Sequence, residues 1–496
     1  MVDTFRHRLT TRARAVLLAL AALAVAGSST SAAVLAFGGP GGGHNGLPPI
    51  KHVWLIILEN KSYEASFTGL NQNSYLWETL PSYGVLLSQY YGTGHYSADN
   101  YVSLVSGQAP TPDVQNDCPQ YTDVSPGTPA ADGQVNASSG CVYPGYVQTL
   151  FNQFDQNGIS WKAYMQDMGN DPTREEANDC GIPGNPSGSG VVDPGSAEPA
   201  SSNTATGIAD QYVPKHNPTV FFDSLINTPN CQNVEALGPW NSGPTSAPGL
   251  AHDLQSEATT PEFSWITPNN CDDAHDATCK GPDDPTTQPA NQPPGSQGGL
   301  YASDIFLKFW IPKIMASPAF QDDGLIDITF DEAFPPYTIY GNSFNNYGAA
   351  GEPGNANSAL NVSTDTAQSV VACCNELPGP NTTEPGAQAF GQDTTPGGGI
   401  TGSVLISRYI KPGTVSAQPY NHYSWLRSME DLFGIDRGGT DGEGHLGYAA
   451  APGLIPFGTD VYSNPSGWGW STPVPSGSGG TFLARAGGYP LDEDNR

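Results

Sequence analysis

Positive charge is scarce in this chain: 18 Lys and Arg residues stand against 48 Asp and Glu among 496 residues, a net charge of −30. Without residues 1–33 the count would be 14 basic against 47 acidic residues. A chain with this balance repels nucleic-acid backbones and anionic membrane surfaces at long range. The composition therefore predicts no nucleic-acid partner. Most of the acidity serves solubility, and part of it is available to bind metal cations.

Long apolar runs are also lacking, except for one from Ala15 to Ala26. Four arginines precede this run, and the small-residue stretch GSSTSAA follows it. This order is typical of a secretory signal peptide cleaved near Ala33, and the run is short for the alternative, a membrane anchor. We therefore expect a secreted, extracellular protein without stable membrane insertion.

The cysteines do not have the spacing of a zinc ribbon, which argues against a structural zinc site of that type. Their even number, eight, fits an exported and oxidised protein. Near-neighbour pairs are the simplest bridges to expect, namely Cys118–Cys141 and Cys271–Cys279. The adjacent Cys373 and Cys374 form either one vicinal bridge or two separate bridges.

Glycine and proline are abundant, with 59 and 45 residues, and they cluster in loop-like segments. No internal repeat is present. This clustering predicts four parts along the chain: a signal peptide (1–33), a Gly-rich linker (34–49), one main domain (50–463) and a Gly/Ser/Pro-rich tail (464–496). The main domain carries long Gly/Pro-rich loop insertions at 106–145, 181–210, 227–250, 276–300 and 340–400.

Three apolar runs have the length of strands and are apolar on both faces, which predicts central strands of a covered sheet. They are HVWLIIL (52–58), LIDITF (325–330) and SVLISRYI (403–410). Helical patterns lie between them at 100–107, 146–158, 303–317 and 423–435. Strands that alternate with helices predict an α/β fold with a central β-sheet sandwiched by helices.

Two of these strands end directly in a pair of oxygen-bearing side chains. Glu59 and Asn60 follow the first strand, and Asp331 and Glu332 follow the second. Ligands of open α/β sheets bind at the carboxyl ends of the strands. Carboxylate and amide oxygens are hard donors, so the pattern predicts a site for calcium, magnesium or manganese more readily than for zinc, although zinc is possible.

A serine lies at the start of a predicted helix in the segment TGHYSADNYVSLVSG (93–107). Ser97 in this position is most often a helix cap. A hydroxyl at a helix N-terminus also suits phosphate binding, and a nearby cation would favour its ionisation for attack on phosphorus. His95 and Asn100 are close enough in sequence to hold phosphoryl oxygens. The chain has no Gly-x-Ser-x-Gly elbow here, so an acyl hydrolase is disfavoured.

The run DDAHD (272–276) follows the apolar stretch FSWITPN. Alone it would be an acidic surface loop. It nevertheless supplies Asp273 and His275 directly after a strand-like segment, and His422 similarly precedes a predicted helix. Histidine is scarce in this chain, so these positions are candidate site residues.

Six segments, taken in order, resemble a known family: IKHVWLIILENKSYEASF, GHYSADNYVSLVSG, ISWKAYMQDM, FSWITPNNCDDAHD, LIDITFDEA and SVLISRYIKPG…YNHYSWLRSMEDLFGI. They are similar to the secreted bacterial phosphoesterases that include acid phosphatases and non-zinc phospholipases C, within the alkaline-phosphatase-like superfamily. The resemblance covers roughly residues 50–437.

The resemblance implies an alkaline-phosphatase-like fold and a role for each candidate residue. The implied metal ligands are Glu59, Asn60, Ser97, Asp331 and Glu332, with Ser97 as the metal-bound nucleophile. The implied phosphate-binding residues are His95, Asn100, Asp273, His275 and His422, of which His275 and His422 could also protonate the leaving group.

The sequence departs from the family pattern at two places. Asp99 stands where relatives often have proline, and it adds negative charge near the nucleophile. Asp272 and Ala274 replace the first and third residues of an Asn-Asp-Gly-His-Asp pattern. No implied ligand or nucleophile is lost through these changes.

The resemblance implies hydrolysis of phosphate esters through a phosphoserine intermediate. An acid-phosphatase-like phosphomonoesterase is favoured, because little chain follows the last motif and the acidic charge disfavours binding to anionic lipid. A phospholipase C acting on phospholipid head groups is the alternative. A catalytically silent secreted binding protein is the alternative from another class. The oligomeric state is not predicted.

Overall fold

The computed structural model of the protein describes residues 46–118 (apart from 70 and 72), 121–170, 180–181, 211–238 (apart from 227), 249–275, 299–333, 372–386 and 397–467. All described residues lie in one compact unit, residues 41–496. The predicted signal peptide, most of the linker, most of the tail, Cys279 and Asp276 lie outside the described residues.

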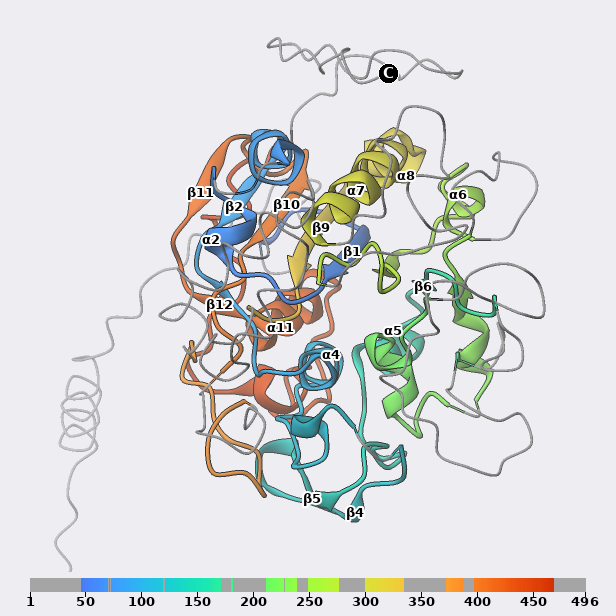
Figure 1. Cartoon of the computed structure of the whole chain (residues 1–496), viewed down its shortest axis with the longest axis vertical. Coiled ribbons are helices and arrows are strands. Elements are labelled where there is room, and N and C mark those ends of the chain that lie inside the picture. Colours follow the sequence, from blue (N-terminus) through green and yellow to red (C-terminus); the bar gives the residue numbers. More distant parts are fainter. Residues whose placement is uncertain are drawn as a thin grey trace, which may run out of the picture. The chain divides into compact units, whose positions relative to one another are not determined.

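An eight-stranded sheet organises this unit, in the spatial order β11-β2-β10-β9-β1-β8-β6-β7 (Figure 1). Its strands along the chain are β1 (His52–Leu58), β2 (Val85–Leu87), β6 (Trp161–Met165), β7 (Val234–Ala236), β8 (Phe263–Thr267), β9 (Gly324–Phe330), β10 (Ser403–Ser407) and β11 (Thr414–Ser416). Two small sheets pair β3 (Tyr90–Tyr91) with β12 (Tyr420–Asn421) and β4 (Ser125–Pro129) with β5 (Val135–Ser139).

Five neighbouring strands of the large sheet, from β9 to β7, run parallel, whereas β10 is antiparallel to β9 and β2. The register of β1 on β9 pairs Leu58 with Phe330, the last residue of each strand. Both predicted pairs of polar side chains therefore leave the sheet at the same edge and side by side. The three predicted strands are confirmed, although β10 ends at Ser407 in a turn before residue 410.

Alternate residues of β1 enter two different cores, one on each face of the sheet. Val53, Leu55 and Ile57 pack with α4 (Ser97–Ser106), α5 (Leu150–Asn157) and α11 (His422–Leu432). Trp54, Ile56 and Leu58 pack with α7 (Gly299–Ala316) and α8 (Pro318–Asp323). Figure 1 shows α7 and α8 on one side of β1 and β9, and α4 and α11 on the other. The predicted sheet sandwiched by helices is confirmed.

All four predicted helices are present, with bounds that their caps explain. The α5 helix begins at Leu150 rather than at 146 because Thr149 and Asn152 form a capping box. The α11 helix begins at His422 because Asn421 caps it. The α4 helix begins at Ser97, as the position of this serine predicted, three residues before the apolar pattern at 100–107. Shorter helices are α2 (Tyr63–Ser66), α3 (Leu80–Tyr83) and α6 (Leu250–Asp253). In the described part of the chain, no helix is long and apolar enough to cross a membrane.

The segment 106–145, predicted as loop, contains the β4–β5 hairpin, whose strands are rich in Ser, Pro and Gly and gave no apolar pattern. The Cys118–Cys141 bridge ties down this region as predicted, and Cys373 and Cys374 form a vicinal bridge. A third bridge, Cys180–Cys231, spans 51 positions, which a preference for near neighbours did not anticipate. Cys271 is also disulfide-bonded.

Candidate active site

The carboxyl ends of β1 and β9 deliver four buried polar side chains to one place, as predicted. The backbone N–H of Asp331 donates to the carbonyl of Leu58 at 2.8 Å, which extends the ladder one residue beyond the strands. The backbone N–H of Asn60 then donates to Asp331 Oδ1 at 2.9 Å, and Asn60 Nδ2 donates to Glu332 Oε1 at 3.1 Å. Residues 271 and more positions apart in sequence thus share one hydrogen-bonded cluster.

Ser97 meets this cluster from the other side. It is the first residue of α4, and its Oγ donates to Glu59 Oε2 at 2.7 Å. One turn further along the same helix, the hydroxyl of Tyr101 donates to Glu59 Oε1 at 2.6 Å. Both carboxylate oxygens of Glu59 are therefore held by α4, and the predicted approach of Ser97 to the first strand is confirmed.

The turn before α4 is strained and is held in place by Asn100. Tyr96 has φ 86°, a conformation that a bulky residue adopts at a cost of about 1–3 kcal/mol and that is most frequent at functional sites. Asn100 Oδ1 accepts from the N–H groups of Thr93 and Gly94, and Asn100 Nδ2 donates to the carbonyls of Gly94 and Tyr96. The amide of Asn100 therefore closes the loop that presents Ser97. A phosphate-binding role for Asn100 stays a prediction, and it requires release of one of these bonds.

Two predicted histidines contact the end of β9. His95 hydrogen-bonds through Nδ1 to Glu332 Oε2, and both side chains are buried. His422 Nε2 lies 2.6 Å from the carbonyl oxygen of Asp331, and its Nδ1 lies 3.0 Å from the Tyr90 hydroxyl. Burial lowers the pKa of His422 to about 4, although the bond to the Asp331 carbonyl opposes this shift. Its imidazole is therefore neutral near pH 7, with Nε2–H donating to the carbonyl.

The DDAHD run reaches the site through its backbone. The N–H of Glu59 donates to the carbonyl of Asp273 at 2.6 Å, and the N–H of His275 donates to Asp273 Oδ1 at 2.9 Å. Between them Ala274 has φ 82°, a left-handed conformation that favours glycine. Asp272 turns away and accepts from Gln166 Nε2 at 2.7 Å. The structure thus brings Asp273 to Glu59.

The sequence reading missed a histidine that lies at the centre of the site. His216 is buried, its Nε2 lies 3.4 Å from Glu59 Oε2, and its ring stacks on Tyr101 at 5.3 Å between centroids. Burial lowers the pKa of His216, and the charges of Lys215 and His275 lower it further. The only sequence signal was the charged pair in VPKHNP (213–218), an isolated short motif between loops.

Two lysines near the site were also not predicted from the sequence. Lys215 forms an ion pair with Asp117, and Asp117 Oδ1 accepts from the N–H of Ala98 at 3.2 Å, at the N-terminus of α4. Lys61, directly after the Glu59–Asn60 pair, is buried, and its Nζ donates to the carbonyl of Asn60 at 3.3 Å. Two lysine side chains thus lie near the carboxylates of the site.

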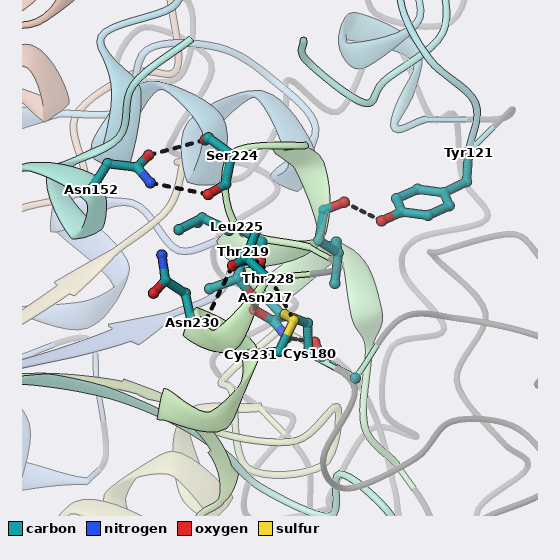
Figure 2. Close-up of a disulfide and its surroundings, with 12 residues drawn as sticks. Tyr121, Asn152, Cys180, Asn217, Thr219, Ser224, Leu225, Thr228, Asn230 and Cys231 are labelled. Atoms are coloured by element: carbon teal, nitrogen blue, oxygen red, sulfur yellow. Dashed lines mark hydrogen bonds between the residues drawn. A yellow bond between two sulfur atoms is a disulfide. The ribbon is translucent and has the colours of Figure 1, made fainter. Parts of the chain in front are cut away.

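The segment that carries His216 is anchored by the Cys180–Cys231 bridge (Figure 2). Asn217 Nδ2 donates to the carbonyl of Cys180 at 2.7 Å, and Thr219 Oγ1 donates to Asn217 Oδ1 at 2.7 Å. Figure 2 shows Asn217 and Thr219 beside the two sulfur atoms. The bridge and the Asn217 amide together fix the residue that follows His216.

Burial is the main cause that raises the pKa of each carboxylate in the site. The charge of Asp331 raises the pKa of Glu59 further, whereas its hydrogen bonds from Ser97 and Tyr101 oppose the rise. The charge of Glu332 raises the pKa of Asp331 further, and His95 opposes the rise at Glu332. Three buried carboxylates at one edge form an anionic cluster that a cation would stabilise.

The donor atoms fit a hard cation. Asn60 Oδ1 and Asp331 Oδ2 are buried oxygens with no hydrogen-bond partner among the described residues. Such atoms normally have a partner in a folded protein, whether protein, water or ion. Within the same residues, no three His, Cys, Asp or Glu side chains converge as metal ligands do. The carboxylates are instead hydrogen-bonded to Ser97, Asn60 and His95. The donor atoms therefore lie in one cluster but do not converge on one position.

Acid phosphatases are similar to part of this chain. A probable acid phosphatase of Kluyveromyces lactis is 24% identical over 283 residues, which are 57% of this chain and 47% of that protein. An acid phosphatase of Aspergillus fumigatus is 24% identical over 277 residues, 56% of this chain and 43% of that protein. The chain thus spans less than half the length of these curated relatives.

Solved structures show a distant likeness. A protein of the alkaline phosphatase superfamily from Vibrio parahaemolyticus has a TM-score of 0.38 and 11% identity, over 80% of this chain and 70% of that one. A lipoteichoic acid synthase from Listeria monocytogenes has a TM-score of 0.39 and 11% identity, over 83% of this chain and 75% of that one.

The profile of the Phosphoesterase family matches residues 70–334, more than half of the chain. This span includes Ser97, His216, the DDAHD run and the Asp331–Glu332 pair. The chain belongs to the Phosphoesterase family.

Proposed function

We propose that the protein is a secreted, metal-dependent phosphoesterase that hydrolyses phosphate monoesters through a phosphoserine intermediate, in the manner of an acid phosphatase. The observation that carries the proposal is the 2.7 Å hydrogen bond from Ser97 Oγ to the buried Glu59 Oε2 at the N-terminus of α4. The acid phosphatases among the relatives of this chain support the choice of a phosphate ester as substrate.

In the proposed first step Ser97 Oγ attacks phosphorus in line with the leaving oxygen. The Oγ–P bond forms, the bond from phosphorus to the leaving oxygen breaks, and the Ser97 proton passes to Glu59 Oε2. Burial raises the pKa of Glu59, so this carboxylate is a stronger base than an exposed one. Tyr101 holds the other oxygen of Glu59, which keeps the carboxylate oriented toward the serine.

In the second step the oxygen of water forms a bond to phosphorus and the Oγ–P bond breaks. The proton lost by water passes to the histidine that protonated the leaving oxygen, and Glu59 returns its proton to Ser97. The transferring phosphoryl group carries charge on its peripheral oxygens, so stabilisation is mainly electrostatic. The proposed phosphate contacts are His95, Asn100, Asp273, His275 and His422. His275 protonates the leaving oxygen, and His422 takes this role only below about pH 4, where its ring is charged. The N-terminus of α4 adds a favourable field for the phosphoryl group.

The proposed cation would be held by Glu59, Asn60, Ser97, Asp331 and Glu332. When bound, a calcium, magnesium or manganese ion supplies positive charge that favours the alkoxide of Ser97 and the developing charge on the phosphoryl oxygens. The unpartnered oxygens of Asn60 and Asp331 support this assignment. Zinc fits less well, because the predicted protein donors are all oxygen.

Replacement of Ser97 by alanine tests the proposal. With p-nitrophenyl phosphate and added divalent cation, we expect Ser97→Ala to lower kcat by at least about 10³-fold, since the nucleophile is lost. Ser103→Ala, on the same helix, is the matched control and should retain turnover. Unchanged turnover in folded Ser97→Ala protein would refute the nucleophile assignment. If the wild type binds p-nitrophenyl phosphate without hydrolysing it, and Ser97→Ala retains the same affinity, the silent binding protein would be favoured.

A substrate panel separates the remaining phosphoesterase alternatives. We expect hydrolysis of p-nitrophenyl phosphate and little release of phosphocholine from phosphatidylcholine vesicles, because the curated relatives are acid phosphatases. Activity on the lipid alone would replace the phosphomonoesterase proposal by a phospholipase C.

A further inference from the structure

A cavity of about 220 Å³ lies between two loops, and the chemical steps proposed above make no use of it. One loop contributes Gln115 and Asn116 to its wall, and the other contributes residues from Asn381 to Gly386. The Gln115 side chain joins the two loops, because its Nε2 donates to the carbonyl of Gly386. A direct contact between distant segments of the chain therefore holds the wall of the cavity together.

Both walls of the cavity are attached to the segment that presents Ser97. A Cβ at Gly386 would lie 3.2 Å from the Cα of Gly94, so the backbones of these two residues pack against one another. Asp117 directly follows the other wall, and its Oδ1 accepts from the N–H of Ala98 at 3.2 Å. The cavity therefore adjoins both the loop before α4 and the first turn of α4.

A further backbone crossing connects the cavity wall to the end of β9. The N–H of Gly397 donates to the carbonyl of Pro385 at 2.9 Å, and the next carbonyl, that of Gly398, accepts from the N–H of Ala333 at 2.8 Å. Ala333 directly follows Glu332, a proposed cation ligand. The wall is thus connected to the nucleophile loop and to the acidic edge of the sheet.

The described residues that line the cavity are mostly polar, and none of them is basic or aromatic. They supply three amides, two hydroxyls, one carboxylate and one apolar ring, from Gln115, Asn116, Asn381, Thr382, Thr383, Glu384 and Pro112. Amides and hydroxyls both donate and accept hydrogen bonds, as the hydroxyls of a sugar or polyol do. An apolar ligand would leave these groups unpaired, and the Glu384 carboxylate would repel an anionic ligand.

Two of the amides are oriented before any ligand binds. Asn116 Nδ2 donates to the carbonyl of Pro112 at 2.8 Å, and no bond within the described residues uses its Oδ1. Asn381 Oδ1 accepts from the N–H of Ala137 at 2.8 Å, and no bond within the same residues uses its Nδ2. The cavity thus offers one fixed acceptor and one fixed donor, which lowers the entropy cost of binding a ligand there.

We propose that this cavity receives the alcohol part of the substrate, and that this alcohol is a neutral sugar or polyol. The inference rests on the proposed function, because the alcohol is the leaving group of the phosphate ester that Ser97 attacks. Asn116, Asn381 and Thr383 hydrogen-bond the hydroxyls of the alcohol, and Glu384 disfavours alcohols that carry negative charge. The cavity therefore selects among phosphate monoesters by the group that departs.

A matched pair of substrates tests the charge of the leaving group. Glycerol 3-phosphate and 3-phosphoglycerate differ in one group, a hydroxymethyl in the first and a carboxylate in the second. We expect the wild type to have the higher kcat/KM for glycerol 3-phosphate. Glu384→Gln should shift the ratio of the two values about fivefold toward 3-phosphoglycerate, because one negative charge is removed. Glu257→Gln, the same change on an exposed residue outside the cavity lining, should leave the ratio unchanged.

A second pair of substrates tests the hydroxyls. Thr383→Val should lower kcat/KM for glucose 6-phosphate about fivefold more than kcat/KM for phenyl phosphate, because one hydrogen bond to the sugar is lost. Thr383→Trp, which fills the cavity, should lower the value for glucose 6-phosphate at least about tenfold. Thr122→Val, on an exposed threonine outside the lining, is the control. Thr383 and Glu384 are exposed, so these variants should fold.

The outcomes separate this proposal from the proposed function. Substrate ratios that stay at the wild-type values in both Glu384→Gln and Thr383→Val would overturn the role of the cavity. The phosphoesterase would then stand, because both variants would still hydrolyse the esters. A wild type that hydrolyses none of the four esters would instead refute the proposed function, and the role of the cavity with it.

Discussion

Asp327 and Asp331 lie four residues apart on one strand and just beyond its end, and both are fully buried, yet their surroundings differ. Asp327 accepts from Ser403 Oγ at 2.6 Å and from Trp425 Nε1 at 2.9 Å, so each of its oxygens has a neutral donor. Asp331 accepts backbone N–H groups at Oδ1 only, and its Oδ2 is unpartnered among the described residues.

The difference is the one expected between a structural acid and an acid that binds a ligand, the role proposed for Asp331. Asp327 ties α11 to β9 through Trp425, and α11 in turn places His422 against the carbonyl of Asp331. The unpartnered oxygen of Asp331 is one that the proposed cation would take as a ligand. Burial alone therefore does not identify a functional carboxylate, whereas an incomplete set of partners does.

The largest difference between Asp331 and Asp327 is expected in turnover. Asp331→Asn removes a charge from the proposed cation site, so we expect kcat/KM for p-nitrophenyl phosphate to fall by at least about 10³-fold, or about 4 kcal/mol. Asp327→Asn should stay within about tenfold of the wild type, since its effect on His422 is indirect. Steady-state kinetics of the two purified variants, with circular dichroism as the check on folding, would decide. Equal losses in both would contradict the distinction.

The next largest effect is expected from Asp327, in the pH dependence of the free energy of unfolding. Burial raises its pKa to about 7, although the bonds from Ser403 and Trp425 oppose the rise. The folded protein therefore binds more protons than the unfolded chain between about pH 4 and 7. Raising the pH through this window should lower the free energy of unfolding, with about 4 kcal/mol from Asp327 alone. Urea unfolding of Asp327→Asn should give a flatter profile, while the exposed control Asp322→Asn should retain the wild-type slope.

His445 should add a smaller pH dependence of the free energy of unfolding, which also falls as the pH rises. Burial would lower its pKa, but hydrogen bonds to Asp431 at 3.2 Å and Asp441 at 2.6 Å outweigh burial and raise it. A histidine with a raised pKa stabilises the fold fully below its ordinary pKa, and this stabilisation is lost as pH rises through the folded value. His445→Gln should lose stability at pH 5 and little at pH 9, measured by urea unfolding.

The smallest effect is expected at the left-handed residue Ala274. Glycine there would relieve about 1 kcal/mol of backbone strain. It would also remove a buried methyl group and give the unfolded chain more freedom, which cost a similar amount. Ala274→Gly should therefore change the free energy of unfolding by less than about 1 kcal/mol. Ala274→Val, which is β-branched at φ 82°, should destabilise by more than this. A stable Ala274→Val protein would disprove the strain.

The sheet and the acidic edge were predictable because they rest on local patterns. Apolar runs ended directly at Glu59 and Asp331, and parallel strands bring such ends together whatever the intervening loops contain. Ser97 was predictable as a helix start, although not as the first helical residue behind a strained Tyr96. Backbone strain of this kind leaves no mark on composition.

His216 was not predictable, because its position depends on contacts that no local pattern encodes. It lies between loops, on a segment fixed by a bridge across 51 positions and by the side chain of Asn217. The unpartnered oxygens of Asn60 and Asp331 were equally hidden, since hydrogen bonding is a property of the assembled site. The sequence reached the identity of most candidate residues but not their partners.

The Cys180–Cys231 bridge has a consequence for how the protein must be produced. In a reducing compartment the sheet could still assemble from its own strands, but His216 would be tethered only by the hydrogen bonds of Asn217 and its neighbours. Protein made in such a compartment would then be folded, but His216 would not be fixed firmly in the candidate site. Maturation of this molecule is in that sense an oxidation as well as a folding event.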